Sequence, residues 1–290
     1  MVVVCSVDGG PRRTFAAIGR TRVRTIRRAG EIVEVDAVGI NEVAAGGFGA
    51  GADAYERGRP GYADDVVAWL VRQLGIAPDT TVLDLAAGTG KLTRVLERPG
   101  VRVVAVEPVA AMRAKLREAC PEVEALEGTA DAVPLPDASV DAVTVAQAFH
   151  WFDPATALAE IARVLRPGGA LGLAFNERDA SEPWVAELSR IIRWDERDRW
   201  RVPYTVEVDW AAVIAEHGPQ FGPVERYDSG YHQALDPDTL VARVLSTSYI
   251  ATLPAVEQAD IELRVRELAE PLGDRFDLPY VSVAYATRLR

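Results

Sequence analysis

Cysteine and histidine are scarce in this sequence of 290 residues. The two cysteines, Cys5 and Cys120, provide neither a disulfide framework nor a set of zinc ligands. The three histidines, His150, His217 and His232, lie far apart in the chain, so we expect no metal site. The low usage of cysteine fits a protein of the reducing cytoplasm.

Long apolar runs are absent as well, which argues against a membrane span of about 20 apolar residues. The apolar residues 1–7 form too short a stretch for a secretory signal, and no basic segment precedes them. The formal net charge is −11, from 32 basic and 43 acidic side chains. Because such a field repels a phosphate backbone, nucleic-acid binding in general is disfavoured, although a local basic patch is left open.

Residues 1–47 differ from the rest of the chain in charge. Seven arginines fall between Arg12 and Arg28, with no acidic residue among them. One interpretation is an arm for nucleic acid or targeting, and the other, which we adopt, is a poorly ordered extension. The segment 44–47 (Ala-Ala-Gly-Gly) is typical of a linker. The chain is 49% apolar and 26% charged, a globular balance, and we assign one domain to residues 48–290.

From residue 48 onward, short apolar strands alternate with stretches of helical spacing. Strands are expected at 81–85, 101–106, 123–126, 140–145 and 170–175. Helices are expected at 64–74, 88–96, 110–119 and 154–166, the last one with Asp153 as its N-cap. This alternation predicts an α/β fold with a doubly wound parallel sheet. Ligands of such sheets bind at the carboxyl ends of the strands.

The pattern after residue 176 is less regular. Two helical stretches are expected at about 237–252 and 255–271, and residues 280–288 alternate in the way of a last strand at the edge of the sheet. Four of the six tryptophans fall within residues 184–210. They are expected either to form a lid over a bound acceptor or to pack in a core.

A loop of small residues, Asp84-Leu-Ala-Ala-Gly-Thr-Gly90, follows the first of these strands. Small residues let the backbone approach a ligand and turn sharply into a helix. A dinucleotide loop needs glycine at position 93, where the chain has Thr93. A phosphate loop needs glycine at 85 and serine or threonine at 92, and both positions are leucine, so Gly90-Lys91 is a chance match. The remaining pattern, D-x-[GA]-x-G-x-G, resembles motif I of class I S-adenosylmethionine-dependent methyltransferases.

An acidic residue, Glu107, stands at the end of the second strand, 17 positions after Gly90. A carboxylate in this place can accept hydrogen bonds from both ribose hydroxyls of a nucleotide and repels a 2′-phosphate. The alternative is a solvated carboxylate in a loop. Its position at a strand end favours the ribose contact.

Further segments strengthen the resemblance when taken in order. They are Tyr55-Glu-Arg-Gly-Arg-Pro-Gly-Tyr62, Val106-Glu107-Pro108 with Met112, Gly128-Thr-Ala130, Gln147-Ala-Phe-His-Trp-Phe152 and Arg163-Val-Leu-Arg-Pro-Gly-Gly169. Together they resemble the methyltransferase type 11 group of small-molecule methyltransferases, which includes trans-aconitate methyltransferase-like proteins. The likeness covers about residues 48–180 and implies a mostly parallel, seven-stranded, Rossmann-like sheet with a helical lid. It implies a core for the cofactor at 48–180, a lid at 181–279 and a terminal strand at 280–290.

The resemblance also implies a set of residues that bind S-adenosylmethionine. They are Tyr55, Arg59, Asp84, Ala86, Gly88, Gly90, Glu107, Pro108, Met112, Thr129, Ala130 and Gln147. Tyr55 and Arg59 would lie over the carboxylate end of the cofactor, the glycines and Gln147 near its methionine part, and Glu107 on its ribose. Met112, Thr129 and Ala130 would meet the adenine, with a core methionine as the alternative for the first. The sequence departs from the family pattern at two positions. Many relatives have an acidic residue in place of Thr129, and here Asp131 would take over its contact with the adenine. Ala86 adds a methyl group where glycine is commoner.

The acceptor side is implied to hold His150, Trp151, Asn176 and Trp184. His150 is a candidate general base because histidine titrates near neutral pH, and its alternatives are acceptor binding and plain packing. We therefore expect methyl transfer from S-adenosylmethionine to an oxygen, nitrogen or carbon atom of a small molecule. A non-catalytic cofactor-binding protein is the alternative, and an NAD-dependent dehydrogenase is disfavoured by Thr93.

Overall fold

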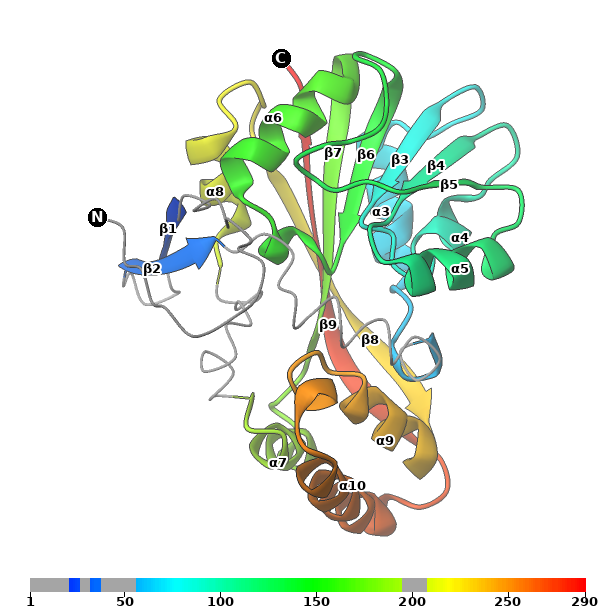
Figure 1. Cartoon of the computed structure of the whole chain (residues 1–290), viewed down its shortest axis with the longest axis vertical. Coiled ribbons are helices and arrows are strands. Elements are labelled where there is room, and N and C mark those ends of the chain that lie inside the picture. The colour runs from blue at the N-terminus through cyan, green and yellow to red at the C-terminus, as the bar shows by residue number, and fades with distance from the viewer. Residues whose placement is uncertain (1–20, 27–31, 38–55, 195–207) are drawn as a thin grey trace, which may run out of the picture.

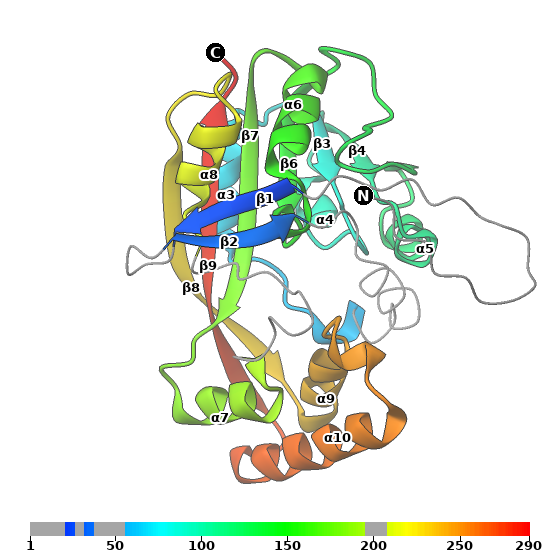
Figure 2. The same ribbon diagram turned by 60° about the vertical axis from the view of Figure 1, so that its left-hand side comes forward.

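The computed structural model describes residues 21–26, 32–37, 56–194 and 208–290 (Figure 1). One large mixed sheet runs through the molecule, and a group of helices forms a cap at one end of its longest strands (Figures 1 and 2). In the part of the chain so described, no helix is both long enough and apolar enough to cross a membrane.

The main sheet has seven strands in the order β5-β4-β3-β6-β7-β9-β8. In chain order they are β3 (Thr81–Leu85), β4 (Arg102–Val106), β5 (Glu124–Leu126), β6 (Val140–Ala146), β7 (Leu165–Arg178), β8 (Glu225–Leu235) and β9 (Phe276–Arg288). Strands β5, β4, β3, β6 and β7 are parallel to one another, whereas β9 is antiparallel to both β7 and β8. The predicted α/β, doubly wound and mostly parallel sheet is therefore confirmed.

Helices cover both faces of this sheet because its strands alternate their side chains between two cores. In β3, Val82 points to the core beneath α3, α4 and α5, and Leu83 points to the core beneath α6 and α8. These helices are α3 (Asp64–Leu74), α4 (Thr93–Leu96), α5 (Ala110–Ala119), α6 (Pro154–Val164) and α8 (Trp210–His217). The predicted cap of α6 is present, since Asp153 accepts a hydrogen bond from the Thr156 N–H at 2.9 Å.

The cap has a small core of its own. It is built from α7 (Pro183–Ile191), α9 (Pro237–Leu245) and α10 (Ala255–Ala269), together with the far ends of β8 and β9. Short 3-10 turns lie at η1 (Phe149–Trp151), η3 (Ile250–Thr252) and η4 (Glu270–Leu272). The long strands β7, β8 and β9 join the cap to the sheet (Figure 2).

Several predicted boundaries are wrong. The helix expected at 88–96 is only α4, because the backbone of Gly88 and Gly90 has φ of 59° and 85°. The strand expected at 170–175 extends over 165–178. The last strand is not at the edge, since β8, which the sequence analysis did not find, pairs with its outer side.

Two expectations about the division of the chain remain predictions. In the extension expected at 1–47, strands β1 (Thr21–Ile26) and β2 (Ile32–Ala37) form an antiparallel pair, and the other residues lie outside the described part. The region expected as a lid at 181–279 is divided in space. Its helices α7, α9 and α10 form the cap, whereas α8 packs on α6 in the main core.

Candidate cofactor and acceptor site

The carboxyl ends of β3, β4, β6 and β7 meet at the edge of the sheet that faces the cap (Figure 1). Chain connections from β3 lead to β4 on one side, and β6 lies on the other side. This is the point where the strand order reverses, which is where open α/β sheets bind ligands. Loops that follow these strands therefore carry the candidate site.

The small-residue loop after β3 has three residues in the left-handed region. The φ angles are 58° at Ala86, 59° at Gly88 and 85° at Gly90. A Cβ atom placed on Gly88 would meet no atom within 4 Å, so the loop presents an open backbone face there. A Cβ atom on Gly90 would lie 3.2 Å from Leu116, so this glycine lets α5 pack closely. Replacing the commoner glycine by Ala86 does more than add a methyl group. It also strains the backbone by roughly 1–2 kcal/mol, because a non-glycine residue is disfavoured in the left-handed region.

Glu107 is buried at the end of β4 and joins that strand to the loop. Its carboxylate accepts hydrogen bonds from the Gly88 N–H at 2.9 Å and from the Val109 N–H at 2.8 Å. Pro108, which separates Glu107 from Val109 in the sequence, has no backbone N–H to donate. Burial raises the pKa of Glu107 even though both backbone donors lower it. A carboxylate has about four lone-pair positions, so two remain for a ligand.

Asp84 lies beneath the same loop and is buried. Its two oxygens accept hydrogen bonds from the hydroxyls of Thr93, at 2.6 Å, and Thr144, at 3.1 Å. Burial raises its pKa to about 6, and the nearby charge of Glu107 adds to this. Asp84 thus ties the start of α4 and the middle of β6 to the end of β3.

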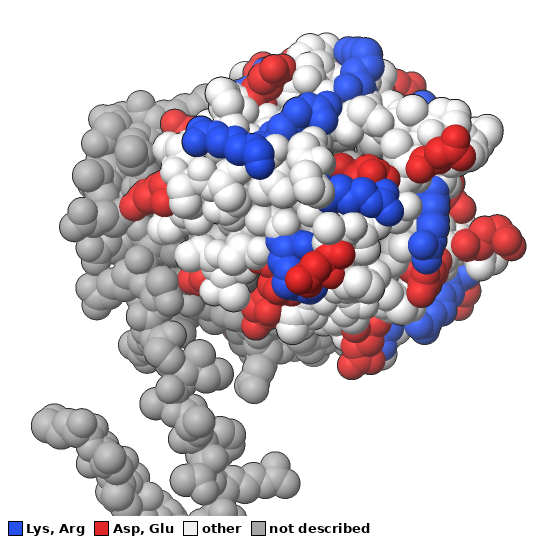
Figure 3. Space-filling model, turned by 90° about the horizontal axis from the view of Figure 1, so that it is seen from above, with Lys and Arg blue, Asp and Glu red and all other residues white. Residues whose placement is uncertain are grey.

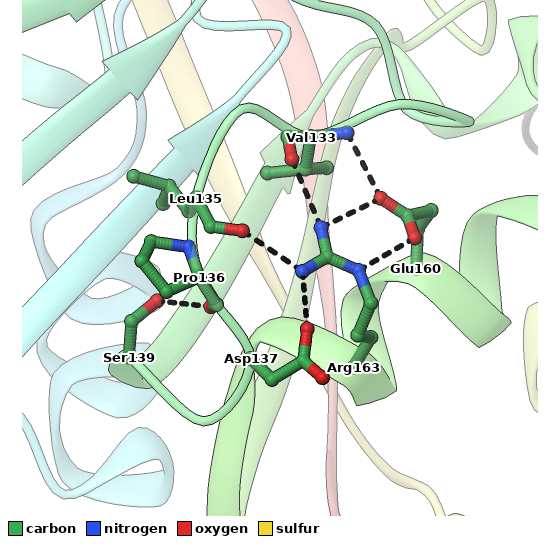
Figure 4. Close-up of polar contacts among 7 residues, drawn as sticks. All are labelled: Val133, Leu135, Pro136, Asp137, Ser139, Glu160 and Arg163. Atoms are coloured by element: carbon green, nitrogen blue, oxygen red, sulfur yellow. Dashed lines mark hydrogen bonds and ion pairs between the residues drawn. The ribbon is translucent and has the colours of Figure 1, made fainter.

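The predicted adenine contacts lie on α5 and in the loop after β5. Met112 and Ala130 are buried, Thr129 is half-buried, and Asp131 is exposed. The loop continues to residues 133–137, which Arg163 of α6 fixes in place (Figure 4). All five of its N–H groups have acceptors, in the carboxylates of Glu160 and Asp137 and in two backbone carbonyls of the loop. This explains the arginine at the start of the segment 163–169, for which the sequence analysis gave no role.

A pocket opens beside the glycine loop. Its lining comes from Arg59, Pro60, Tyr62, Asp84, Ala86, Ala87, Gly88, Thr89, Lys91, Leu92, Ala146, Gln147, Asn176 and Arg243. Six of the predicted site residues thus lie around one space, and α9 of the cap contributes an arginine that the sequence analysis missed. Gly90, Glu107, Pro108, Met112, Thr129, Ala130, His150, Trp151 and Trp184 are not in this lining. Tyr55 lies outside the described residues.

Gln147 and Asn176 hold the floor of this pocket. Gln147 follows β6 with φ of 55°, and its side-chain amide donates to the Asn176 carbonyl at 3.0 Å. Strained backbone of this kind is concentrated at functional sites. The Asn176 side chain donates to the Gly61 carbonyl at 2.6 Å and accepts from the Ser282 hydroxyl at 2.5 Å. Asn176 therefore attaches the segment 59–62 to the sheet.

Glu56 attaches the start of that same segment to the glycine loop. Its carboxylate accepts hydrogen bonds from the Thr89 hydroxyl at 2.5 Å and from Arg94 at 2.7 Å, and Lys91 donates to its backbone carbonyl at 2.8 Å. Burial acts to raise the pKa of Glu56, but these hydrogen bonds and positive charges lower it overall. The sequence analysis treated Lys91 as part of a chance match, and its role appears only when residues 56 and 91 are brought together.

His150 lies in η1 between the sheet and the cap. Its ring centroid is 4.9 Å from that of Trp151 and 6.4 Å from that of Phe175. Its Nδ1 is buried and has no hydrogen-bond partner among the described residues. Burial, helped by the charge of Arg59, lowers the pKa of His150 to about 3. The imidazole is therefore neutral near pH 7 and is a weak base.

The tryptophans that the structure describes pack in cores. Trp184 lies edge-on to Phe276 in the cap, with ring centroids 5.7 Å apart. Trp210 stacks on Phe175 in the main core at 5.2 Å. Trp151 is partly buried against the cap core. Packing, one of the two alternatives for this segment, therefore accounts for Trp184 and Trp210, whereas Trp200 lies outside the described residues.

Comparison with known proteins shows the family of the chain. Residues 83–173 match the family model described as a methyltransferase domain. An uncharacterised methyltransferase of Mycobacterium tuberculosis strain H37Rv is 44% identical over 250 residues, which cover 83% of this chain and 95% of the relative. A methyltransferase-like protein of Schizosaccharomyces pombe is 34% identical, over 80% of this chain and 91% of the relative. The chain therefore belongs to the class I S-adenosylmethionine-dependent methyltransferases.

Solved structures share the fold. A methyltransferase from an antibiotic biosynthesis pathway of Anabaena variabilis superposes with a TM-score of 0.55 at 20% identity, over 79% of this chain and 98% of that one. The YcgJ protein of Bacillus subtilis gives 0.51 at 21% identity, over 79% and 99%. Both likenesses support the Rossmann-like sheet.

Proposed function

We propose that the pocket edge of the sheet binds S-adenosylmethionine and directs its methyl group to a small-molecule acceptor held between sheet and cap. The observation that carries this proposal is the contact between Glu107 and the Gly88 N–H. It holds a carboxylate against the open backbone face of the glycine loop, at the point where the strand order reverses. A ribose with two free hydroxyls fits such a carboxylate.

The residues present suit the other parts of the cofactor. The open face of Gly88 leaves space for the methionine part, and Arg59 and Lys91 in the pocket lining suit its carboxylate end. Met112 and Ala130 offer apolar surface for the adenine. Tyr55 and Pro108 remain in the proposed set on the resemblance alone.

When bound, S-adenosylmethionine supplies a methyl group on a positively charged sulfur, whose C–S bond breaks as a lone pair of the acceptor atom forms the new bond. The chain orients the two reactants and keeps water out. His150, as a neutral imidazole, suits hydrogen bonding to the acceptor better than proton removal. Trp151 and Asn176 are proposed to shape the same space.

The charge of the chain supports a small acceptor. Basic and acidic side chains lie interspersed on the end of the molecule that faces away from the cap (Figure 3). That face has no broad positively charged patch, which the binding of a nucleic-acid backbone requires. Together with the net charge of −11, this favours a small molecule as the acceptor.

Calorimetry on the full chain tests the cofactor site. Wild-type protein should bind S-adenosylmethionine and S-adenosylhomocysteine, and not NAD. Glu107→Gln should weaken binding of both at least tenfold, because a charge-assisted hydrogen bond contributes about 1.5–3 kcal/mol. Glu124→Gln, an exposed carboxylate paired with Arg102, is the matched control and should leave affinity unchanged.

The possible results of this experiment distinguish an error in the proposed function from an error in the role of Glu107. Failure of the wild-type protein to bind either compound contradicts the proposed function. Equal affinity in Glu107→Gln and wild type contradicts the role of Glu107 alone. Release of S-adenosylhomocysteine with a panel of acceptors decides against the non-catalytic alternative.

A further inference from the structure

The loop of residues 128–137 folds back on itself between β5 and β6. It carries Thr129 and Ala130, which are proposed to meet the adenine. Thr129 and Ala132 form an antiparallel bridge, in which the Ala132 N–H donates to the Thr129 carbonyl at 3.3 Å. Apart from this bridge, the loop has no strand or helix of its own. Its position therefore depends on contacts with other elements.

Arg163 holds the backbone of this loop from α6 (Figure 4). Its Nη2 donates to the Val133 carbonyl at 2.9 Å, and its Nη1 donates to the Leu135 carbonyl at 2.8 Å. Glu160, one turn earlier on α6, accepts two hydrogen bonds from Arg163, at 2.8 and 2.9 Å, and one from the Val133 N–H at 2.9 Å. Because a guanidinium is planar and rigid, this pairing fixes the direction from which both carbonyls are held.

Pro134 stands between these two carbonyls and packs on the start of the loop. A Cβ atom placed on Gly128 would lie 2.5 Å from the Pro134 Cδ and 3.1 Å from the Val106 Cγ1. Gly128 is therefore confined between the proline ring and the end of β4. Glu107, which follows Val106, donates its backbone N–H to the Leu126 carbonyl at 3.1 Å. A displacement of Pro134 would thus be passed to Gly128 and to the residues that follow it, beside the proposed ribose contact.

The helix that carries Arg163 is a firm support. Its residues Leu158 and Ile161 are fully buried in the main core, and Val133 of the loop belongs to that same core. Arg163 is not in the lining of the pocket, so any effect on cofactor binding is indirect. Binding residues on a loop reach a precise geometry only when packing and hydrogen bonds from rigid elements hold them.

We infer that Arg163 is a positioning residue for the base of the cofactor. It acts through Pro134 on residues 128–130 and so sets where the loop meets the edge of the adenine. This inference rests on the proposed function, because it takes that loop as the adenine side of the site. Loss of Arg163 should therefore reduce the preference for adenine over a related base, and not only the stability of the fold.

Calorimetry of the full chain with S-adenosylhomocysteine and S-inosylhomocysteine tests this role. The two compounds differ only in the base, whose N1 and C6 groups exchange hydrogen-bond donor and acceptor. A site that hydrogen-bonds one pattern rejects the other, so the wild-type protein should bind the adenosyl compound at least about tenfold more tightly. In Arg163→Gln the ratio of the two affinities should fall at least about fivefold, because a displaced loop no longer matches adenine.

This ratio separates positioning from stability. Arg163→Gln should also lower the melting temperature, since Glu160 and the loop carbonyls lose a donor. Arg163→Lys keeps the charge but cannot span both carbonyls, so it should not restore the ratio. Arg166→Gln is the matched control, because it breaks an ion pair with Asp141 of 2.6 Å at the end of the sheet away from the pocket. It should leave both affinities unchanged.

Pro134→Ala is the second variant and decides the matter if Arg163→Gln does not fold. It leaves the backbone carbonyls that Arg163 holds in place and removes the ring that confines Gly128. The ratio should again fall at least about fivefold. Where both variants fold, the double variant should lose no more than the more affected single variant, because both changes act along one path.

The inference is overturned if the wild-type protein binds both compounds equally. It is also overturned if the ratio is retained in Pro134→Ala or in folded Arg163→Gln. Each of these results contradicts the role of Arg163 and leaves cofactor binding itself intact. A wild-type protein that binds neither compound contradicts the proposed function instead.

Discussion

The two sides of the pocket differ in how their charges are satisfied. On the sheet side, Glu107 is held by two backbone N–H groups and Asp84 by two threonine hydroxyls. On the cap side, the Nε of Arg178 has no hydrogen-bond partner among the described residues, and Arg243 is held by a neutral group, the Tyr280 hydroxyl. The carboxylates of the sheet side are therefore held by groups of the fold itself, whereas the cap side leaves a guanidinium nitrogen without a partner among the described residues.

This difference corresponds to two kinds of binding: that of a cofactor shared by all proteins of the fold, and that of an acceptor specific to one protein. A cofactor that is common to a class of enzymes can be bound by backbone groups, because their geometry depends little on side-chain identity. An acceptor must be distinguished from others, and buried charges do this because a wrong ligand leaves them unpaired. The acceptor specificity of this enzyme is accordingly expected to reside in the cap.

The largest expected effect follows from closing the open face of the loop. Gly88→Ala should weaken S-adenosylhomocysteine at least 100-fold, because the new Cβ occupies space in which the cofactor is proposed to lie. The positive φ should also cost about 1–2 kcal/mol of unfolding free energy. Gly168→Ala has a similar φ of 76° and equally open surroundings at the other end of the sheet. It should lose the same stability with no change in affinity, and equal affinity in both variants would contradict the placement of the cofactor.

The second prediction concerns the internal charge of Asp84. Its folded pKa of about 6 lies above the ordinary 3.8, so the folded state holds the proton more tightly. Stability is therefore greatest below pH 3.8 as far as this group is concerned, and falls as pH rises toward 6. Relative to wild type, Asp84→Asn should gain about 2 kcal/mol of unfolding free energy between pH 4 and pH 7.

Urea unfolding at several pH values measures this, with Asp141→Asn as the control. Asp141 is a more exposed carboxylate whose pKa is lowered by Arg166 and a backbone N–H, although burial opposes them. That variant should therefore change in the opposite direction. A pH-independent difference between Asp84→Asn and wild type would show that the carboxyl titrates normally in the fold.

The sheet side could be predicted from the sequence because its information is local. The strand at 81–85, the loop at 84–90 and Glu107 follow one another within 27 residues, and the periodicity of buried strands is strong there. The helix at 64–74 is correct for the same reason. Boundaries failed where tertiary pairing decides them, as in β7, which extends to 178 only because β9 runs beside it.

The cap side could not be predicted in this way. Its arginines come from β7 and α9, and their geometry depends on Tyr280 and Gly58, which are far apart in the chain. An arginine in a sequence with 32 basic residues carries no signal of burial. Strand β8 was missed because its alternation of exposed polar residues resembles a loop. Only the fold brings these positions together.

A smaller effect is expected at His150, which lies where the two sides meet. Its pKa of about 3 is below the ordinary 6.5, so the neutral form prevails at neutral pH and a general-base role worth 10²–10⁴-fold is not expected. Once an acceptor is known, His150→Gln should lower turnover by less than about tenfold and raise the acceptor KM. Its ring resonances should not titrate between pH 5 and pH 8. A drop of about 100-fold in turnover with unchanged affinity would instead establish the base.

The smallest expected effect is that of Ala86→Gly. This variant tests whether the sheet side of the pocket is already shaped for the cofactor. Ala86 holds a φ of 58°, and glycine removes strain of roughly 1–2 kcal/mol there. Glycine also gives the unfolded chain more freedom, which costs about 0.4–1 kcal/mol, so the net gain in unfolding free energy should be under about 1 kcal/mol. Affinity for S-adenosylhomocysteine should stay within about twofold, because the hydrogen bond between Gly88 and Glu107 is untouched. A large gain in affinity would mean that the Ala86 methyl group obstructs the cofactor, and the sheet side would then be less complete than its internal hydrogen bonds imply.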